Sequence, residues 1–204
     1  MQATPDTRCT AFAGTRRIAS GALRHVALVA QRELQSNDPQ AGSEPILIFD
    51  ERTSHLIEVD LRGSSADLLK RLAESDVAVR AEVEDLPEPR KGPGRPRLGV
   101  VAREVTLLPR HWQWLAAQPG GASVALRKLV EDARRANAGN DRKRAAQESA
   151  YRFMATMAGD APGFEEATRA LFAGDASAFE ERIGAWPDDV RDHAALLAAD
   201  ALRD

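Results

Sequence analysis

Side chains that could do chemistry are few and scattered along the sequence. The chain has one cysteine, Cys9, and four histidines, which are His25, His55, His111 and His193. No two histidines have the HExxH or HxxxH spacing of a metal site, and the GxSxG, GxxxxGK[ST] and GxGxxG motifs are missing from the sequence. We therefore expect no catalytic residues, no metal site, no cofactor and no enzymatic activity.

Polar groups gather at one place in the first 80 residues. Asp50, Glu51 and His55 surround a short polar connection, and an enzyme that uses a cleft here is one alternative function. The same residue types favour turns, where their side chains bond to the nearby backbone. The adjacent pairs Glu165-Glu166 and Glu180-Glu181 would splay around a helix, which indicates solvated first turns.

Positive charge is concentrated in the middle of the chain. Residues 90–144 carry 13 Lys and Arg against 4 Asp and Glu, a net charge of +9, whereas residues 1–89 have −5 and residues 145–204 have −7. A local field of this sign attracts a polyanion, although the net charge of the whole chain is −3. The alternative is that some of these basic side chains pair with the acidic flanks inside the folded protein.

Residues 84–99 have the composition of a linker. Their four prolines and three glycines disfavour a helix and interrupt strand pairing, and the segment is basic from Arg90 to Arg97. On A·T-rich DNA, proline keeps such a chain extended, glycine permits close approach to the minor groove, and arginine enters the narrow negative slot. We therefore expect this linker to contact DNA.

The linker resembles the AT-hook, a short DNA-binding segment with a Gly-Arg-Pro core. Gly94, Arg95 and Pro96 match that core, but Pro93 stands where the family has an arginine. The resemblance implies binding in the minor groove of A·T-rich DNA, weakened by the loss of one groove-inserting side chain. The predicted DNA-binding residues are Arg90, Lys91, Gly94, Arg95, Pro96, Arg97 and Arg103.

Residues 103–137 resemble the ribbon-helix-helix family of bacterial DNA-binding regulators. They contain a strand candidate, a proline, a helix, a glycine-containing turn and a helix with the order Ala-Leu-Arg-x-Leu-Val. In that family two chains pair their strands into a ribbon that enters the major groove, so the resemblance implies a homodimer. The matching core and turn positions are Leu108, Pro109, Trp112, Leu115, Gly120, Gly121, Leu126, Leu129 and Val130.

The expected strand has an unusual outer face. Counted back from the proline, alternate positions place Leu107, Val105 and Arg103 toward DNA, and two of these three are apolar. Either a β-bulge shifts the alternation, or the segment keeps the fold without reading bases. A further alternative is that the tryptophans and leucines of this segment only form a core.

The chain as a whole is similar to a bacterial family grouped as domain of unknown function 2239. The similarity rests on residues 103–135 and on the preceding Gly-Pro-Gly-Arg-Pro-Arg-Leu-Gly. It implies a bacterial source and supplies no activity.

The first third of the chain predicts two hairpins, each followed by a helix. Thr10–Phe12 and Arg17–Ala19 flank Gly14, a turn residue, and Ser20 is expected to cap a helix that ends near Gln35. The second hairpin would join the apolar run 45–50 to the alternating run 55–61. A capping box should then start a helix that buries a leucine stripe, and its residues are Ser64, Asp67, Leu68, Leu69 and Leu72.

The rest of the chain predicts one strand and several helices. We expect a strand at Val100–Leu108, a helix from about Arg110 to Gln118, and a helix from Ser123 to Asn137-Ala138-Gly139. A stripe of Tyr151, Met154 and Met157 marks a later helix. Residues 159–166 and 174–181 repeat with an offset of 15, which predicts two helices with similar caps and phenylalanine anchors.

The sequence thus predicts an α+β protein in four parts. These are a ββαββα domain at residues 1–83, a basic Pro/Gly linker at 84–99, a ribbon-helix-helix-like segment at 100–139 and a helical module at 140–204. The predicted function is that of a DNA-associated regulatory protein, a homodimer that binds duplex DNA with an A·T-rich preference. The alternative is a protein-interaction module, antitoxin-like or an adaptor, whose acidic C-terminal module binds a protein partner without direct DNA binding.

We expect a cytoplasmic protein without a membrane partner. No apolar run approaches the roughly 20 residues that a membrane span needs, and the amino terminus lacks the apolar core of a signal peptide. A single cysteine also excludes an intramolecular disulfide, and the absence of disulfides is typical of proteins in reducing compartments.

Overall fold

The structure is a computed structural model that describes residues 3–36, 44–84 and 103–203. The chain divides into two compact units, and we call residues 1–86 with 142–204 unit 1, and residues 87–141 unit 2. The segments that we expected to form separate amino-terminal and carboxy-terminal domains therefore belong to the same unit. The predicted linker lies outside the described residues, except for its first residue.

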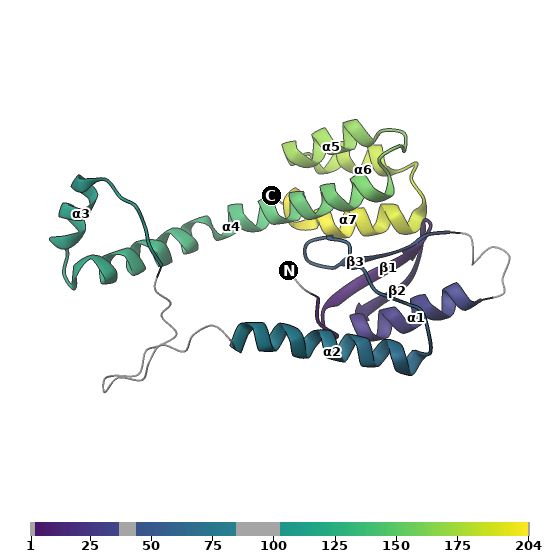
Figure 1. Ribbon diagram of the computed structural model, residues 1–204. Helices are drawn as coiled ribbons and strands as arrows, with labels where there is room; N and C mark the ends of the chain where they lie inside the picture. Colours follow the sequence, from purple (N-terminus) through teal and green to yellow (C-terminus); the bar gives the residue numbers. More distant parts are fainter. Residues whose placement is uncertain (1–2, 37–43, 85–102, 204) are drawn as a thin grey trace. The chain divides into compact units, whose positions relative to one another are not determined.

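A three-stranded antiparallel sheet with the order β2-β1-β3 lies at the centre of unit 1 (Figure 1). β1 (Arg8–Ala13) and β2 (Arg16–Ala22) form the predicted first hairpin, and Gly14 at its turn has a φ of +53°, which glycine adopts easily. β3 (Ile46–Asp50) pairs with the other edge of β1. The central strand is consequently buried from its second residue to its last.

The prediction of a fourth strand at residues 55–61 is wrong. The chain turns after β3, and in the described part of the chain a single isolated bridge, between Phe49 and Leu56, is all that follows. The order of unit 1 is therefore ββαβα before the C-terminal helices. The predicted alternation still describes burial, because every second side chain packs against the core beside α1, namely Ile57, Val59 and Leu61.

α1 (Leu23–Gln35) follows β2 directly, and the predicted Ser20 cap is wrong. Ser20 lies in β2, and Ala22 occupies the N-cap position without a side-chain hydrogen bond. The buried side chain of Gln31 fastens the next segment to α1. Its Nε2 donates to the carbonyl oxygen of Leu61 at 2.9 Å, and its Oε1 accepts from the hydroxyl of Ser65 at 2.9 Å.

α2 (Ser65–Glu84) begins at the predicted capping box. The Ser64 Oγ accepts from the N–H of Asp67 at 3.2 Å, and the Asp67 Oδ2 accepts from the N–H of Ser64 at 3.0 Å. The Ser64 hydroxyl also donates to the Asp67 Oδ2 at 2.7 Å, and this bond, together with the one from the Ser64 N–H, holds the pKa of the Asp67 carboxyl below its ordinary value. Leu68 is buried as expected, whereas Leu69 is exposed. The buried stripe of α2 therefore contains fewer leucines than the sequence predicts.

The C-terminal part of unit 1 is helical, as predicted. α4 (Gly121–Met157) belongs to it from residue 142 onward, and α5 (Phe164–Ala173), α6 (Ala176–Ile183) and α7 (Asp188–Leu202) follow. Of the predicted stripe on α4, Met154 is buried but Tyr151 is exposed.

The two copies of the 15-residue repeat differ in structure. Asp175 caps α6, because its Oδ1 accepts from the N–H of Ala178 at 3.0 Å, whereas Gly163 occupies the N-cap position of α5 in the left-handed region. Phe164 is consequently the first residue of α5, while Phe179 lies in the fourth position of α6 and is fully buried. The shared sequence therefore places its phenylalanine differently in the two helices.

Unit 1 has three layers, with the sheet between two layers of helices (Figure 1). α1 and α2 cover one face, over a core of Cys9, Ala11, Leu23, Val26, Ala30 and Ile48. The helices from α4 to α7 cover the other face. The large side chains of that second core are Phe12, Phe49, Phe153, Met154, Leu171, Phe179, Ile183, Trp186 and Val190.

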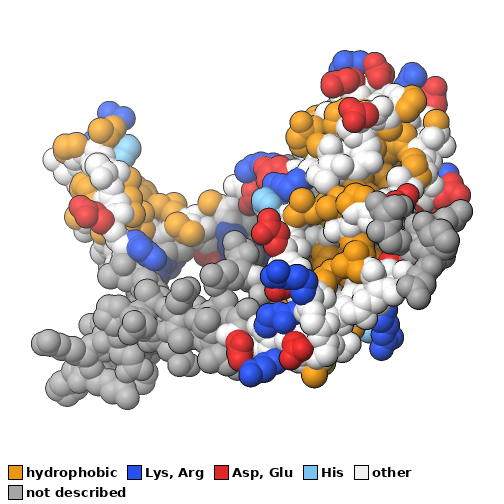
Figure 2. Space-filling model, turned by 45° about the vertical axis from the view of Figure 1, so that its right-hand side comes forward, with side chains coloured by type: hydrophobic (Ala, Val, Ile, Leu, Met, Phe, Trp, Pro, Cys, Tyr) orange, Lys and Arg blue, Asp and Glu red, His pale blue; other side chains and the backbone are white. Residues whose placement is uncertain are grey.

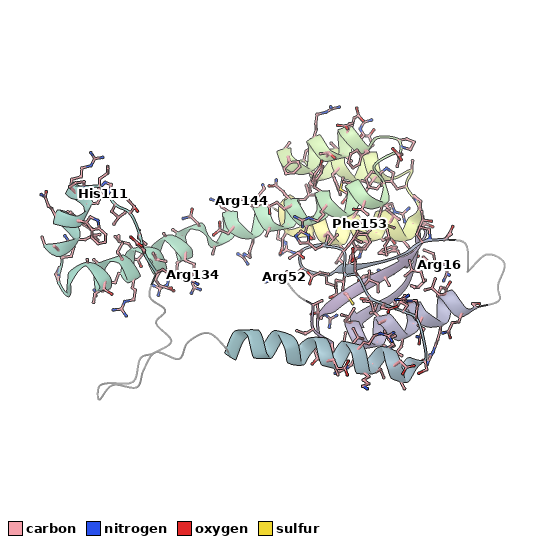
Figure 3. The ribbon with its side chains drawn as sticks, viewed as in Figure 1. Arg16, Arg52, His111, Arg134, Arg144 and Phe153 are labelled. Atoms are coloured by element: carbon pink, nitrogen blue, oxygen red, sulfur yellow. The ribbon has the colours of Figure 1, made fainter. Side chains whose placement is uncertain are left out.

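Phe153 of α4 connects the sheet to the C-terminal helices (Figure 3). Its ring centroid lies 5.4 Å from that of Phe12, 5.1 Å from that of Phe49 and 4.6 Å from that of His193 on α7. Aromatic rings at these separations stabilise the fold by more than the burial of their apolar area alone. The same stretch of α4 also bonds to the turn after β3, since the buried hydroxyls of Ser149 and Ser54 share a hydrogen bond of 2.8 Å.

The described part of unit 2 contains residues 103–108, α3 (Pro109–Ala116), a turn and the first part of α4. Pro109 is in the first helical turn, where its missing N–H costs nothing. Gly120 and Gly121 have φ values of +86° and +73°, so the predicted glycine turn is confirmed. α4 starts two residues earlier than expected.

The strand expected at the start of unit 2 stays a prediction, whereas the expected helix end is wrong. Within a single chain residues 103–108 form no strand, because a lone strand has no neighbour with which to form a ladder, and the expected pairing with a second chain stays a prediction. α4 does not end at Asn137-Ala138-Gly139 but continues to Met157. Within the described ranges, no helix combines the length and the apolar character that a bilayer crossing requires.

We predict that His193 makes the stability of the protein depend on pH. Burial beside Phe12 and Phe153 lowers the pKa of His193 to about 4, with a smaller effect from the charge of Arg17, and the Nδ1 atom is buried without a hydrogen bond. The unfolded chain binds a proton at His193 near pH 6.5, whereas the folded protein does so only near pH 4. The contribution of His193 to the free energy of unfolding is therefore complete above pH 6.5 and is lost as the pH falls toward 4. In that range the free energy of unfolding should change by at most about 1.4 kcal/mol per pH unit because of this group.

Urea unfolding of the wild type and of His193→Phe at several pH values between 4.5 and 7.5 measures this contribution. In that range, the free energy of unfolding of the variant should depend on pH less steeply than that of the wild type, by the uptake of one proton. Parallel curves for the two proteins would contradict the assignment.

Candidate functional site

Six of the seven predicted DNA-binding residues lie outside the described residues. They are Arg90, Lys91, Gly94, Arg95, Pro96 and Arg97. The seventh, Arg103, is exposed at the start of the described part of unit 2.

The described part of unit 2 has five more exposed Lys and Arg side chains that no sequence motif identified, and three of them form no ion pair with a described residue. Arg110 lies in the first turn of α3, and Arg127 and Lys128 lie in the second turn of α4. The Arg127 Nε donates to the carbonyl oxygen of Ser123 at 3.1 Å, which keeps this guanidinium along the helix. None of these three, nor Arg103, forms an ion pair with a described residue. The charge count over residues 90–144 was the signal that could have found them.

Two basic residues farther along α4 are paired within the helix. The Arg134 Nη2 lies 3.1 Å and the Arg135 Nε 3.4 Å from the Glu131 Oε1 (Figure 3 labels Arg134). Exposed ion pairs of this kind contribute little to the stability of the protein, because water and salt screen the charges. These two arginines therefore add to the positive field of the helix, although less than unpaired ones would.

Most of the predicted core of unit 2 is exposed within a single chain. Leu115 and Ala125 are the buried apolar residues in its described part. Figure 2 shows hydrophobic side chains at the surface of this unit, and the large exposed ones are Val105, Leu108, Trp112, Trp114, Leu129 and Val130. Such an accumulation is unusual for a surface that faces only water.

The polar cluster in unit 1 forms a turn. The Asp50 Oδ1 accepts from the N–H groups of Arg52 and Thr53, at 3.0 and 2.8 Å, and from the Thr53 hydroxyl at 2.8 Å. The Glu51 Oε2 accepts from the Arg8 Nε at 2.8 Å. Asp50 and Glu51 are thus committed to local bonds, as expected of turn residues.

The same cluster opens into two different cavities, each of about 440 Å³. Asp50 and His55 line one, together with Thr7 and Thr53, and Glu51 lines the other. The three side chains of the enzyme alternative are therefore not gathered in one cleft. Among the described residues, no three His, Cys, Asp or Glu side chains come together as ligands for a metal ion.

Cys9 lies fully buried in β1, beneath α1. Burial raises the pKa of its thiol to about 12, and the carboxylates of Glu51 and Asp50 act in the same direction. A thiol with this pKa is almost entirely protonated at neutral pH, so Cys9 is unsuited to act as a nucleophile.

The chain belongs to a bacterial family described as an uncharacterized protein conserved in bacteria (DUF2239), whose profile matches residues 8–198. The expected membership of this family is confirmed. The match covers almost the whole chain, and it says nothing about an AT-hook or a ribbon-helix-helix segment. No curated protein and no solved structure is significantly similar to the chain.

We predict that Cys9 reacts very slowly with thiol reagents in the folded protein. At pH 8, its raised pKa should slow reaction with Ellman's reagent on the order of a thousandfold relative to the unfolded chain, because the thiolate is the reacting form. The rate can be followed at 412 nm in buffer and in 6 M guanidinium chloride, since Cys9 is the single cysteine. Similar rates in the two solvents would show that the thiol is accessible and ionised.

Proposed function

We propose that the protein is a DNA-associated regulatory protein that binds duplex DNA as a homodimer. The linker and the helices of unit 2 would supply the positive charge, and a second copy of the chain would cover the apolar residues of unit 2. Because phosphate contacts dominate such binding, it requires no cofactor and no catalytic group.

The observation that carries this proposal is the set of exposed basic side chains without ion pairs in unit 2. Arg103, Arg110, Arg127 and Lys128 are all exposed. Each can neutralise a phosphate without first breaking a pair with a described carboxylate. The chain adds four basic residues between positions 90 and 97, so the positive charge continues along the sequence ahead of the helices.

The exposed apolar residues support the homodimer. Leu129 and Val130 are 46% and 64% exposed, and they belong to the stripe that the helical spacing predicts as a buried face. The described part of unit 2 has two helices and two buried apolar residues, which is too little buried surface for stability on its own. Pairing with a second copy would give this unit the core that it lacks, and would place two basic surfaces on one duplex.

A protein-interaction module, such as an adaptor, is the second candidate. The same apolar residues favour it, because they would fit a different protein as well as a second copy. Under this alternative the purified chain should be a monomer and should not bind duplex DNA at low salt.

We predict that the linker arginines contribute directly to DNA binding. Arg95→Ala with Arg97→Ala should weaken binding to an A·T-rich duplex and lower the slope of log K against log salt by about 1.8, for two lost phosphate-type contacts. The preference for A·T-rich over G·C-rich duplexes should also decrease. Fluorescence anisotropy at 50–200 mM salt measures both effects.

The matched control is Arg169→Ala with Arg182→Ala, which removes two exposed arginines from α5 and α6 of unit 1. This control should bind DNA as the wild type does. Unchanged binding by the linker variant would remove the linker from the proposal, and no binding by the wild type would overturn DNA binding altogether.

We predict that the apolar face of unit 2 holds two copies together. Light scattering should give a mass of about twice 22.1 kDa for the wild type. Leu129→Glu with Val130→Glu should give the mass of one chain, because charges at the interface would lose their hydration. Leu34→Glu is a matched control, since Leu34 is also 46% exposed but lies on α1 of unit 1. A wild type that is monomeric at micromolar concentration would contradict the homodimer.

A further inference from the structure

Unit 1 contains a groove of about 440 Å³ between the second part of α4, α7 and the turn after β3. Ala145, Ala146 and Ser149 line it from α4. Leu196, Leu197 and Ala199 line it from α7, and Leu196 is 66% exposed. The walls are thus mostly small aliphatic groups, and the volume lies within the range of small-ligand sites.

The charged residues at the rim do not balance one another. Glu51 is already engaged, because its carboxylate accepts from the Arg8 Nε at 2.8 Å and from the Ser20 hydroxyl at 2.9 Å. Asp200 is engaged too, with its Oδ1 3.2 Å from the Arg203 Nη1. Arg142 forms no ion pair with a described residue. The open charge at the rim is therefore positive.

The floor offers no competing polar group. Ser149 is the only polar side chain that α4 adds to the floor, and its hydroxyl is already bonded to that of Ser54 at 2.8 Å. A ligand in this groove would consequently find aliphatic contacts along its length and the Arg142 guanidinium at the rim. A second arginine, Arg52 of the turn, also lines the groove (Figure 3).

We propose that this groove binds a small aliphatic carboxylate, with the carboxylate on Arg142 and the hydrocarbon chain between α4 and α7. A carboxylate matches the planar fork of a guanidinium and can accept two hydrogen bonds from it. The hydrocarbon chain covers Leu196, which is otherwise the most exposed leucine of the protein's described residues. This site lies within unit 1 and goes beyond the proposed binding of DNA by unit 2.

Calorimetric titration of the full chain with octanoate tests the proposal, with octan-1-ol and octylamine as probes of the same chain length. Octanoate should bind saturably, and the two other probes at least about tenfold more weakly, because they cannot accept hydrogen bonds from Arg142 as an anion does. Arg142→Gln should weaken octanoate binding by about tenfold and should leave the binding of octan-1-ol unchanged.

A second variant tests the hydrocarbon part of the site. Ala145→Phe should remove octanoate binding by filling the groove, and thermal unfolding of the same sample shows whether unit 1 is intact. Arg127→Gln is the matched control, since it removes an unpaired arginine of the same helix in unit 2 and should leave octanoate binding unchanged. The proposal is overturned if octanoate does not bind saturably, or if a folded Ala145→Phe protein and Arg142→Gln bind it as the wild type does.

Discussion

The structure of unit 1 depends on the packing of Phe153 between the sheet and α7. This one ring contacts Phe12 and Phe49 from two strands and His193 from the last helix, at centroid distances of 4.6–5.4 Å. Since α4 is fixed here, its neighbours Ser149 and Arg152 can bond to the turn after β3, through Ser54 Oγ and the Thr53 carbonyl oxygen. The same contact therefore positions the turn, both cavities beside it and the helices that wall the groove.

Local signals in the sequence predicted most elements of unit 1, and failed where the outcome depends on distant residues. The glycine turn of the first hairpin and the Ser64–Asp67 capping box need only neighbouring residues, and both are confirmed. Residues 55–61 have the alternation of a strand and the burial that it implies, but alternation cannot show whether a neighbouring strand continues alongside. The shared core of Phe12 and Phe153 joins residues that are 141 positions apart, for which the sequence contains no local signal.

The candidate site in unit 2 shows the same limit in another form. The helical spacing identified Leu129 and Val130 as an apolar stripe, yet a pattern of spacing does not say what covers the stripe. The sequence predicts a helix end at Asn137-Ala138-Gly139, but Asn137 and Gly139 only lower the helix propensity, and α4 continues through them. The net charge of the segment predicted the exposed basic residues better, because it is a sum over residues and can be counted without knowledge of the fold. Arg110, Arg127 and Lys128 fall within the segment that the charge count singled out.

Unit 1 is built from both ends of the chain, and this has a consequence for its synthesis. The aromatic face of the sheet, with Phe12 and Phe49, is complete only when His193 and the rest of α7 have been translated. At ribosomal speeds of about 5–20 residues per second, the roughly 180 intervening residues take on the order of ten to forty seconds. During that time the nascent hairpin leaves this apolar surface uncovered, and exposed apolar surface of this kind favours aggregation.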